Sequence, residues 1–214
     1  MATSSPERSA AWSCCLWRRA VTLVLAAVAL GGCSFDLSSF TPPKDKPSDT
    51  KATAADSAVS PANVSEAQTH TARGQTLAKS GQTAEALEEF NQAVALDPYN
   101  AQALYGRALI RQANNQHELA IEDFAAASGL NPQKADPLLG RATSYLAIGK
   151  AKEAATDLDE ASEADPHNVQ VWTTRGLAYE RLGDKTRAAA SYSKAVALRP
   201  RDDAARNGLA RVGG

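Results

Sequence analysis

The chain has 214 residues, a formal net charge of −1 and 22% charged residues. A chain this close to neutral has no basic field with which to attract nucleic acid, so we expect no nucleic-acid partner. Hydrophobic residues make up 43% of the sequence but aromatic residues only 6%. The apolar material is therefore mainly alanine and leucine, which suits helices that pack closely.

Residues 1–32 have the features of a secretory signal peptide. Arg8, Arg18 and Arg19 precede an apolar run, AVTLVLAAVAL at residues 20–30, which only Thr22 interrupts. Eleven residues of helix span about 16 Å, too short for a hydrocarbon core of about 30 Å. A basic start, a short apolar run and then small residues are typical of an export signal that is later removed.

The apolar run ends in LGGCS at residues 30–34. This stretch resembles the lipobox of bacterial lipoproteins, and the resemblance implies that the Cys33 thiol receives a diacylglyceryl group and becomes the new amino terminus. Several acyl chains hold a protein durably on a membrane. The resemblance thus predicts a covalent lipid on Cys33, and Ser34 after it favours the outer membrane, facing the periplasm. We expect no other cofactor.

Cysteine usage agrees with this prediction. Cys14 and Cys15 lie in the segment that would be removed, so Cys33 would be the only cysteine of the mature chain. One cysteine cannot form an internal disulfide, so the fold must depend on packing.

Residues 33–66 are expected to form the lipidated cysteine followed by a disordered tether. Pro42, Pro43, Pro47 and Pro61 stand among Ser, Thr, Ala, Asp and Lys. Such a segment buries too little apolar surface to offset its chain entropy. Fully extended it would reach about 110 Å, and its last few residues can already join the first helix.

From residue 67 the sequence repeats with a period of 34 residues. AVALDP at 93–98 returns as AVALRP at 195–200, and prolines stand at 98, 132, 166 and 200. A fixed period of this length is the signature of a repeat architecture. It defines four units, numbered internally from position 1 to position 34: 67–100, 101–134, 135–168 and 169–202.

Large and small residues recur at fixed positions of each unit. Positions 4, 8 and 11 share one face of a first helix, and positions 20, 24 and 27 share one face of a second. Small residues at 8 and 20 let the two helices approach. Position 15, where the chain turns between the helices, holds residues that tolerate a left-handed conformation: Gly81, Asn115, Gly149 and Gly183.

This pattern resembles the tetratricopeptide repeat. The fourth unit carries it most completely, in Trp172, Gly176, Tyr179, Ala188, Tyr192, Ala195 and Pro200. The resemblance implies an all-α fold, a right-handed superhelical solenoid of four helix-turn-helix units in a domain at 67–214. Residues 203–212 are expected to form a capping helix. Asn100 and Asn168 are expected to cap first helices, as is Asp136 before Pro137.

Arginine recurs at position 7, in Arg107, Arg141 and Arg175. We expect the first two to pair with acids at position 23 of their own units, Asp123 and Asp157. The third meets Ser191 there and needs an acid from another unit, such as Asp157. The alternative is that the three arginines form a basic strip that binds a ligand.

No group of residues in the sequence suggests catalysis. His70, His117 and His167 occur at unrelated positions of different units, and no pair of them has metal-ligand spacing. The sequence has no phosphate-binding or dinucleotide-binding glycine loop. We therefore expect no enzyme and no metal site.

In the tetratricopeptide family the first helices line a concave groove that holds a segment of another protein. By this resemblance the groove residues are Gln75, Lys79, Tyr105, Leu109, Gln112, Leu139, Thr143, Leu146, Thr174, Glu180 and Arg181. Some members bind a chaperone's C-terminal carboxylate through clustered Lys, Arg and Asn, which this groove does not have. The alternative is that its apolar residues merely pack on one another.

The sequence thus predicts a membrane-anchored scaffold of the cell envelope that binds another protein or peptide segment. The alternative function is an assembly factor of a pilus or secretion apparatus, which some tetratricopeptide lipoproteins resemble. Nothing in the sequence indicates the oligomeric state.

Overall fold

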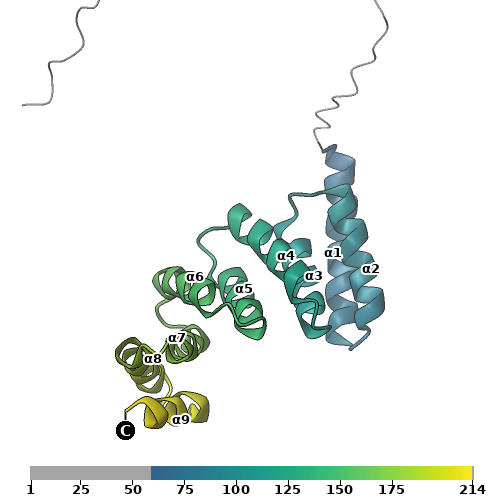
Figure 1. Ribbon diagram of the computed structural model, residues 1–214. Helices are drawn as coiled ribbons and strands as arrows, with labels where there is room; N and C mark the ends of the chain where they lie inside the picture. The colour runs from purple at the N-terminus through teal and green to yellow at the C-terminus, as the bar shows by residue number, and fades with distance from the viewer. Residues whose placement is uncertain (1–58, 214) are drawn as a thin grey trace, which may run out of the picture. The chain divides into compact units, whose positions relative to one another are not determined.

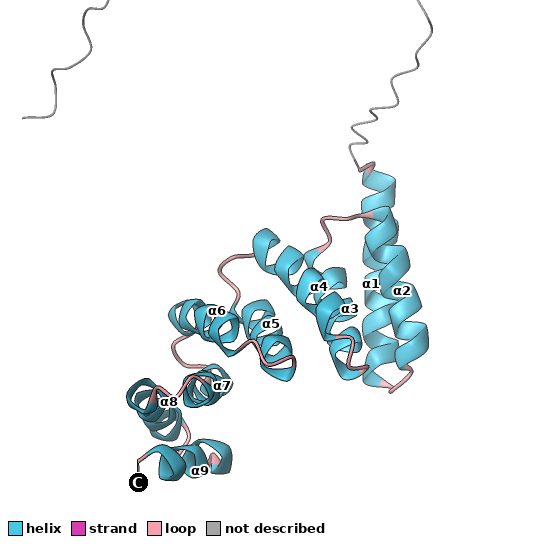
Figure 2. Ribbon diagram, viewed as in Figure 1, coloured by secondary structure: helices cyan, strands magenta, loops and turns pink. Residues whose placement is uncertain are grey.

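The computed structural model describes residues 59–213, which form nine α-helices and no strand (Figure 1, Figure 2). The predicted signal peptide, Cys33 and the tether up to residue 58 lie outside the described residues. The helices are α1 (Pro61–Lys79), α2 (Thr83–Leu96), α3 (Ala101–Ala113), α4 (His117–Leu130), α5 (Ala135–Ala147), α6 (Ala151–Ala164), α7 (Val169–Arg181), α8 (Lys185–Leu198) and α9 (Asp203–Val212).

The helices pair into the four expected units, and α9 follows the last one (Figure 1). Each first helix packs on the second helix of its own unit and on the first helix of the next unit. Among the described helices, second helices make no such contacts with one another. The first helices therefore line the inner side of the array and the second helices its outer side. The expected all-α repeat solenoid with a terminal helix is confirmed.

The turns between the two helices of a unit have the predicted backbone conformation. The φ angles at position 15 are 81° for Gly81, 59° for Asn115, 80° for Gly149 and 77° for Gly183. Only glycine, and to a lesser degree asparagine, adopts this left-handed region at little cost. Asn115 thus performs the same role as the three glycines.

Two of the three predicted helix caps are confirmed. The side chains of Asn100 and Asn168 accept hydrogen bonds from backbone N–H groups of the first turns of α3 and α7. The prediction for Asp136 is wrong, because α5 begins at Ala135 and its N-cap residue is Lys134. Asp136 lies inside the first turn, where its carboxylate still complements the helix dipole.

Helix α1 begins earlier than the predicted end of the tether at residue 66. It starts at Pro61, so residues 61–66 are helical. Ser60 provides the N-cap, since its hydroxyl oxygen accepts a hydrogen bond from the Asn63 N–H at 3.2 Å. Proline is well suited to the first position of a helix, where its missing N–H costs nothing.

Large residues at position 24 lock consecutive units together. The Phe90 ring lies against Gly74 of its own unit and against Gly106, at position 6 of the next unit. A Cβ atom on Gly106 would stand 2.5 Å from this ring, and one on Gly140 would stand 2.5 Å from the Phe124 ring. The glycine at position 6 is therefore the socket for the preceding aromatic side chain.

The same lock recurs at the end of the array, but the third unit differs. Tyr192 packs between Gly176 of its own unit and Gly208 of α9. The third unit has Leu158 at position 24, and the residue at position 6 of the next unit is Thr174. Where the side chain at position 24 is smaller, the socket at position 6 of the next unit thus holds a larger residue.

The arginines at position 7 form the ion pairs expected within units two and three. Arg107 donates to both carboxylate oxygens of Asp123, at 2.9 and 2.6 Å. Arg141 donates to both oxygens of Asp157, at 2.7 and 2.6 Å. In each pair the carboxylate is nearly buried. These contacts favour a structural role over a ligand-binding strip.

Arg175 binds Ser191 as expected, at 2.8 Å, but its acid is Asp159 at 2.7 Å. The suggestion of Asp157 is wrong, because both oxygens of that carboxylate already bind Arg141. Asp159 stands at position 25 of the third unit, so this ion pair crosses from α6 to α7.

Candidate protein-binding surface

Two of the predicted groove leucines do not reach the inner surface. Leu139 is 8% exposed and Leu146 is 5% exposed, and both belong to the hydrophobic core of units three and four. Their assignment to a binding groove is wrong. Helix α5 lies between its neighbours α3 and α7, which favours the alternative that these leucines pack within the array.

Two further predicted residues link neighbouring units. The Gln112 amide donates to the Gly140 carbonyl at 2.9 Å and to the Ser144 hydroxyl at 2.8 Å, which ties α3 to α5. Arg181 donates to the Leu146 carbonyl and ties α7 to α5. Since these polar groups already have partners, a ligand would have to displace them.

Glu180 is part of the junction with the terminal helix. Its carboxylate accepts hydrogen bonds from Arg211 at 2.8 and 2.9 Å and from the Tyr192 hydroxyl at 2.6 Å. The hydrogen bonds from Arg211 are the main reason that the pKa of Glu180 lies below its ordinary value. This predicted groove residue holds α9 on α7.

The other predicted groove residues remain at least partly accessible: Gln75, Lys79, Tyr105, Leu109, Thr143 and Thr174. Leu109 is the most apolar of them and is 40% exposed. These side chains come from all four first helices, so they follow the inner surface along the array.

A first hollow lies where units one and two meet, and its volume is about 310 Å³. Asn100 connects its walls, because its side chain caps α3 and also donates to the Thr71 hydroxyl of α1 at 3.1 Å. Tyr99 beside it is 72% exposed. The lining residues are Gln68, Thr71, Ala72, Gln75, Asp97, Tyr99, Asn100, Ala101 and Gln102.

A second hollow, of about 300 Å³, lies at the equivalent place between units two and three. The Tyr105 ring forms one wall and packs on Phe124, with 5.8 Å between the ring centroids. Burial, and then the nearby Asp136 carboxylate, raise the pKa of Tyr105 above its ordinary value. The remaining lining residues are Ala101, Gln102, Ala127, Asn131, Lys134, Asp136 and Pro137.

The two hollows adjoin, since Ala101 and Gln102 line both. The sequence prediction missed Gln68, Gln102 and Asp136, all at position 2. The repeat contained a signal for them, because position 2 is glutamine in three of four units: Gln68, Gln102 and Gln170. A carboxamide both donates and accepts hydrogen bonds, so it can pair with the main chain of an extended segment.

The described residues, 59–213, hold no group of three or more His, Cys, Asp or Glu side chains placed to bind a metal ion. No helix within this range is both long and apolar enough to cross a membrane.

Three family models match the chain, and all three describe the same type of repeat. A model described as "Tetratricopeptide repeat" matches residues 139–203 and 174–212, and another with the same description matches residues 101–134. A third, described as "TPR repeat", matches residues 74–115. Among curated proteins, no relative matches the chain.

Solved structures with the same fold include MamA, at 17% identity and a TM-score of 0.65, over 69% of this chain and 80% of MamA. PilF of Pseudomonas aeruginosa has 20% identity and a TM-score of 0.62, over 71% of this chain and 69% of PilF. The first repeat domain of Spaghetti, bound to the HSP90 peptide SRMEEVD, has 20% identity and a TM-score of 0.52. That match covers 53% of this chain and 90% of the Spaghetti domain. At such identities the likeness shows the fold.

Proposed function

Because the chain belongs to the tetratricopeptide-repeat family, whose domains bind proteins or peptides, we propose that it is a membrane-anchored scaffold of the cell envelope. It binds a segment of another protein along the inner surface of its repeats and catalyses no reaction. The observation that carries this proposal is the pair of adjoining hollows between units one, two and three.

The lining of the hollows favours a segment with few charges. It is largely uncharged and polar, and in the second hollow Lys134 and Asp136 offset one another. Tyr99 and Leu109 add exposed apolar surface nearby, and aromatic residues are frequent anchors in protein interfaces. An extended segment can fill hollows with its side chains while glutamines such as Gln102 bind its main chain.

Photo-crosslinking from matched positions tests this proposal. Leu109 on α3 and Leu119 on α4 are 40% and 42% exposed, but they lie on the inner and outer sides of the same unit. Each is replaced in turn by a photoreactive amino acid in cells, and crosslinked products are identified by mass spectrometry. We expect a specific product from position 109 only. A product from position 119 alone would place the binding surface on the second helices.

The likeness to Pseudomonas aeruginosa PilF favours a second candidate, an assembly factor of a pilus or secretion apparatus. The same crosslinking experiment separates the two functions. A pilus or secretion subunit as the product of position 109 would support the assembly factor. Any other envelope protein would support a general scaffold.

The anchor is proposed to be a lipid on Cys33, within the stretch LGGCS. Cys33→Ser should move the protein from the membrane fraction to the soluble fraction or leave the precursor uncleaved, and it should abolish labelling by palmitate. Cys15→Ser, inside the expected signal peptide, is the control and should leave labelling unchanged. Palmitate incorporation into the Cys33→Ser variant would refute the anchor, while sedimentation with outer-membrane markers tests the location.

A further inference from the structure

Positions 3, 6 and 10 of each first helix form the face that meets the preceding unit. In α1 this face, which we call the outer face of α1, meets no preceding unit among residues 59–213. In the later first helices positions 3 and 10 are buried, and position 6 is buried or half-buried. In α3 these are Ala103 and Ile110, which are 0% and 6% exposed, and Gly106, which lies against Phe90. In α1 the equivalent residues, Thr69, Ala72 and Thr76, are all exposed.

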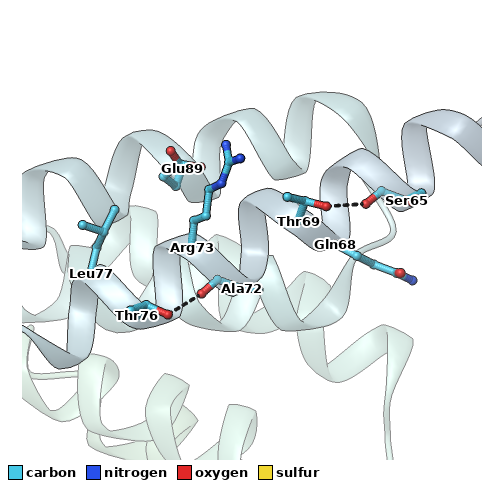
Figure 3. Close-up of a pocket in the computed structure, with 8 residues that line it drawn as sticks. All are labelled: Ser65, Gln68, Thr69, Ala72, Arg73, Thr76, Leu77 and Glu89. Atoms are coloured by element: carbon cyan, nitrogen blue, oxygen red, sulfur yellow. Dashed lines mark hydrogen bonds between the residues drawn. The ribbon is translucent and has the colours of Figure 1, made fainter.

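These residues line an open hollow of about 760 Å³, which Figure 3 shows. The lining residues are Ser65, Gln68, Thr69, Ala72, Arg73, Thr76, Leu77 and Glu89. The Thr69 and Thr76 hydroxyls donate to carbonyls one turn earlier in α1, those of Ser65 and Ala72. Their methyl groups remain available for contact with another surface.

Arg73 stands at position 7, the position of the paired arginines in the other units. Two of those three arginines also reach position 25 of the preceding unit, while Arg141 has Ala125 there. Arg107 donates to Asn91 at 3.3 Å, and Arg175 donates to Asp159 at 2.7 Å. The side chain at position 25 is thus a recurrent partner of this arginine across unit junctions.

The partner that Arg73 would have in its own unit is already engaged. Position 23 of unit one is Glu89, and one of its oxygens lies 2.7 Å from His70 Nδ1. Within residues 59–213, Arg73 forms no ion pair, and Figure 3 draws no hydrogen bond between Arg73 and Glu89. An exposed guanidinium therefore lies at the place where each later unit meets its predecessor.

Ala72, at position 6, defines the size of the side chain that can pack on it. In units two and three this socket is glycine because a phenylalanine ring fills it, and a Cβ atom there would stand 2.5 Å from the ring. Thr174 occupies the socket in unit four, and the residue at position 24 before it is Leu158. A Cβ-bearing socket such as Ala72 thus suits an aliphatic side chain of leucine size.

We propose that the outer face of α1 binds an amphipathic helix of a partner protein, stacked as the second helix of a preceding unit would be. A leucine of that helix packs on Ala72, and the Asp or Asn that follows it binds Arg73. Among the helices of residues 59–213, α6 has this pair, in Leu158 and Asp159. This site adjoins the first hollow of the inner surface, since Gln68 and Ala72 line both, but it does not depend on the function proposed there.

A synthetic peptide of residues 151–164, AKEAATDLDEASEA, is the probe. It is titrated to millimolar concentration into the isotope-labelled full chain, because a free helix of this length is only marginally stable in water. We expect amide shifts at Thr69, Ala72, Arg73 and Thr76 but not at Leu109 on the inner surface. A scrambled peptide of the same composition should produce none of them.

Charge reversal identifies the contact. Arg73→Glu should weaken binding of the peptide about threefold to fivefold, the range expected for loss of a partly exposed ion pair. The same peptide with Asp159→Arg should recover binding to that variant. Lys194→Glu, at an exposed residue of α8, is the control and should leave the affinity unchanged. Absent shifts on α1, equal shifts with the scrambled peptide, or failure of the charge swap to restore binding would overturn the proposal.

Discussion

The two halves of the repeat array differ in how their cores are connected. In the C-terminal half, α5 to α9, the buried apolar residues form one cluster that runs from Ala135 to Val212. In the N-terminal half, α1 to α4, they form two separate clusters, around Phe90 and around Phe124. The core of the N-terminal half is therefore divided, although the cluster around Phe90 includes Ala103 and Ile110 of unit two, while the C-terminal units share one cluster.

The N-terminal half, although its core is divided, has more of the candidate binding surface than the C-terminal half. Both hollows of the inner surface involve α3, and the exposed outer face belongs to α1. At the other end α9 covers the last unit and is held by the ion pair of Arg211 with Glu180. The half with the divided core thus presents the candidate binding surfaces, while the half with the continuous core supplies stability. This division agrees with the general tendency of binding elements to come from less stable regions.

The largest expected effect comes from removing the side chain at position 24 in each half. Phe124→Ala should destabilise the chain by about 3–5 kcal/mol, since the ring is fully buried. Because solenoid units stabilise only their neighbours, amide hydrogen exchange should increase in α3 and α4 and remain slow in α8. Tyr192→Ala should instead accelerate exchange throughout α5 to α9. Equal acceleration over all nine described helices in both variants would show that the halves share one cooperative core.

A smaller effect is expected at the boundary between the halves. Gly140→Ala places a Cβ atom 2.5 Å from the Phe124 ring and should destabilise by about 1–3 kcal/mol through overpacking. Gly129→Ala is the matched control, because a Cβ atom there has no neighbour within 4 Å and should stabilise by up to about 1 kcal/mol. Urea unfolding measures both changes. A Gly140→Ala variant as stable as the parent would mean that the junction can adjust without loss.

The smallest effect concerns the pH dependence of the terminal helix. The pKa of Glu180 is lowered, chiefly by hydrogen bonds from Arg211. The ion pair therefore contributes fully above the ordinary glutamate pKa of 4.5, and its contribution disappears as the pH falls through the lowered value. Because Arg211 is 54% exposed, solvent screening keeps the contribution of this ion pair small.

Melting temperatures at pH 7 and pH 3 test this linkage. The parent should lose more stability between the two values than Glu180→Gln, which cannot titrate at this position. Glu163→Gln, at an exposed position of α6, is the control and should behave like the parent. Identical losses in the parent and Glu180→Gln would exclude the ion pair as a source of acid sensitivity.

The period of 34 residues was sufficient to predict the fold, because each position has one structural role throughout the array. It placed the left-handed turns at Gly81 and Asn115 and paired Arg107 with Asp123. The acid that binds Arg175 could not be read from one unit, because Asp159 lies in the unit before it. Contacts between units depend on how the units pack, and the pattern within one unit does not specify that packing.

The candidate binding surface was predicted less well than the fold. Leu109 and Leu139 stand at different positions of equivalent helices, and both are apolar, yet one is 40% exposed and the other 8%. Apolar character alone does not distinguish a side chain that contacts a partner from one that packs against the next helix. Glutamine at position 2 was the more informative signal, because Gln68, Gln102 and Gln170 are all exposed.

The match between each position-24 side chain and the following socket restricts how the array could have lengthened by duplication. A second copy of unit two could follow the original without a clash, since its Gly106 would meet Phe124 as it now meets Phe90. A second copy of unit four could not, because Thr174 would be placed against Tyr192, which at present requires a glycine, Gly208. Only unit three, which has Leu158 at position 24, leaves room for a threonine in the next unit. The order of the units is therefore restricted by the side-chain volumes at position 24 and at position 6 of the next unit. A recombined gene that joins two units with large side chains at both positions would encode an array with a clash at the new junction.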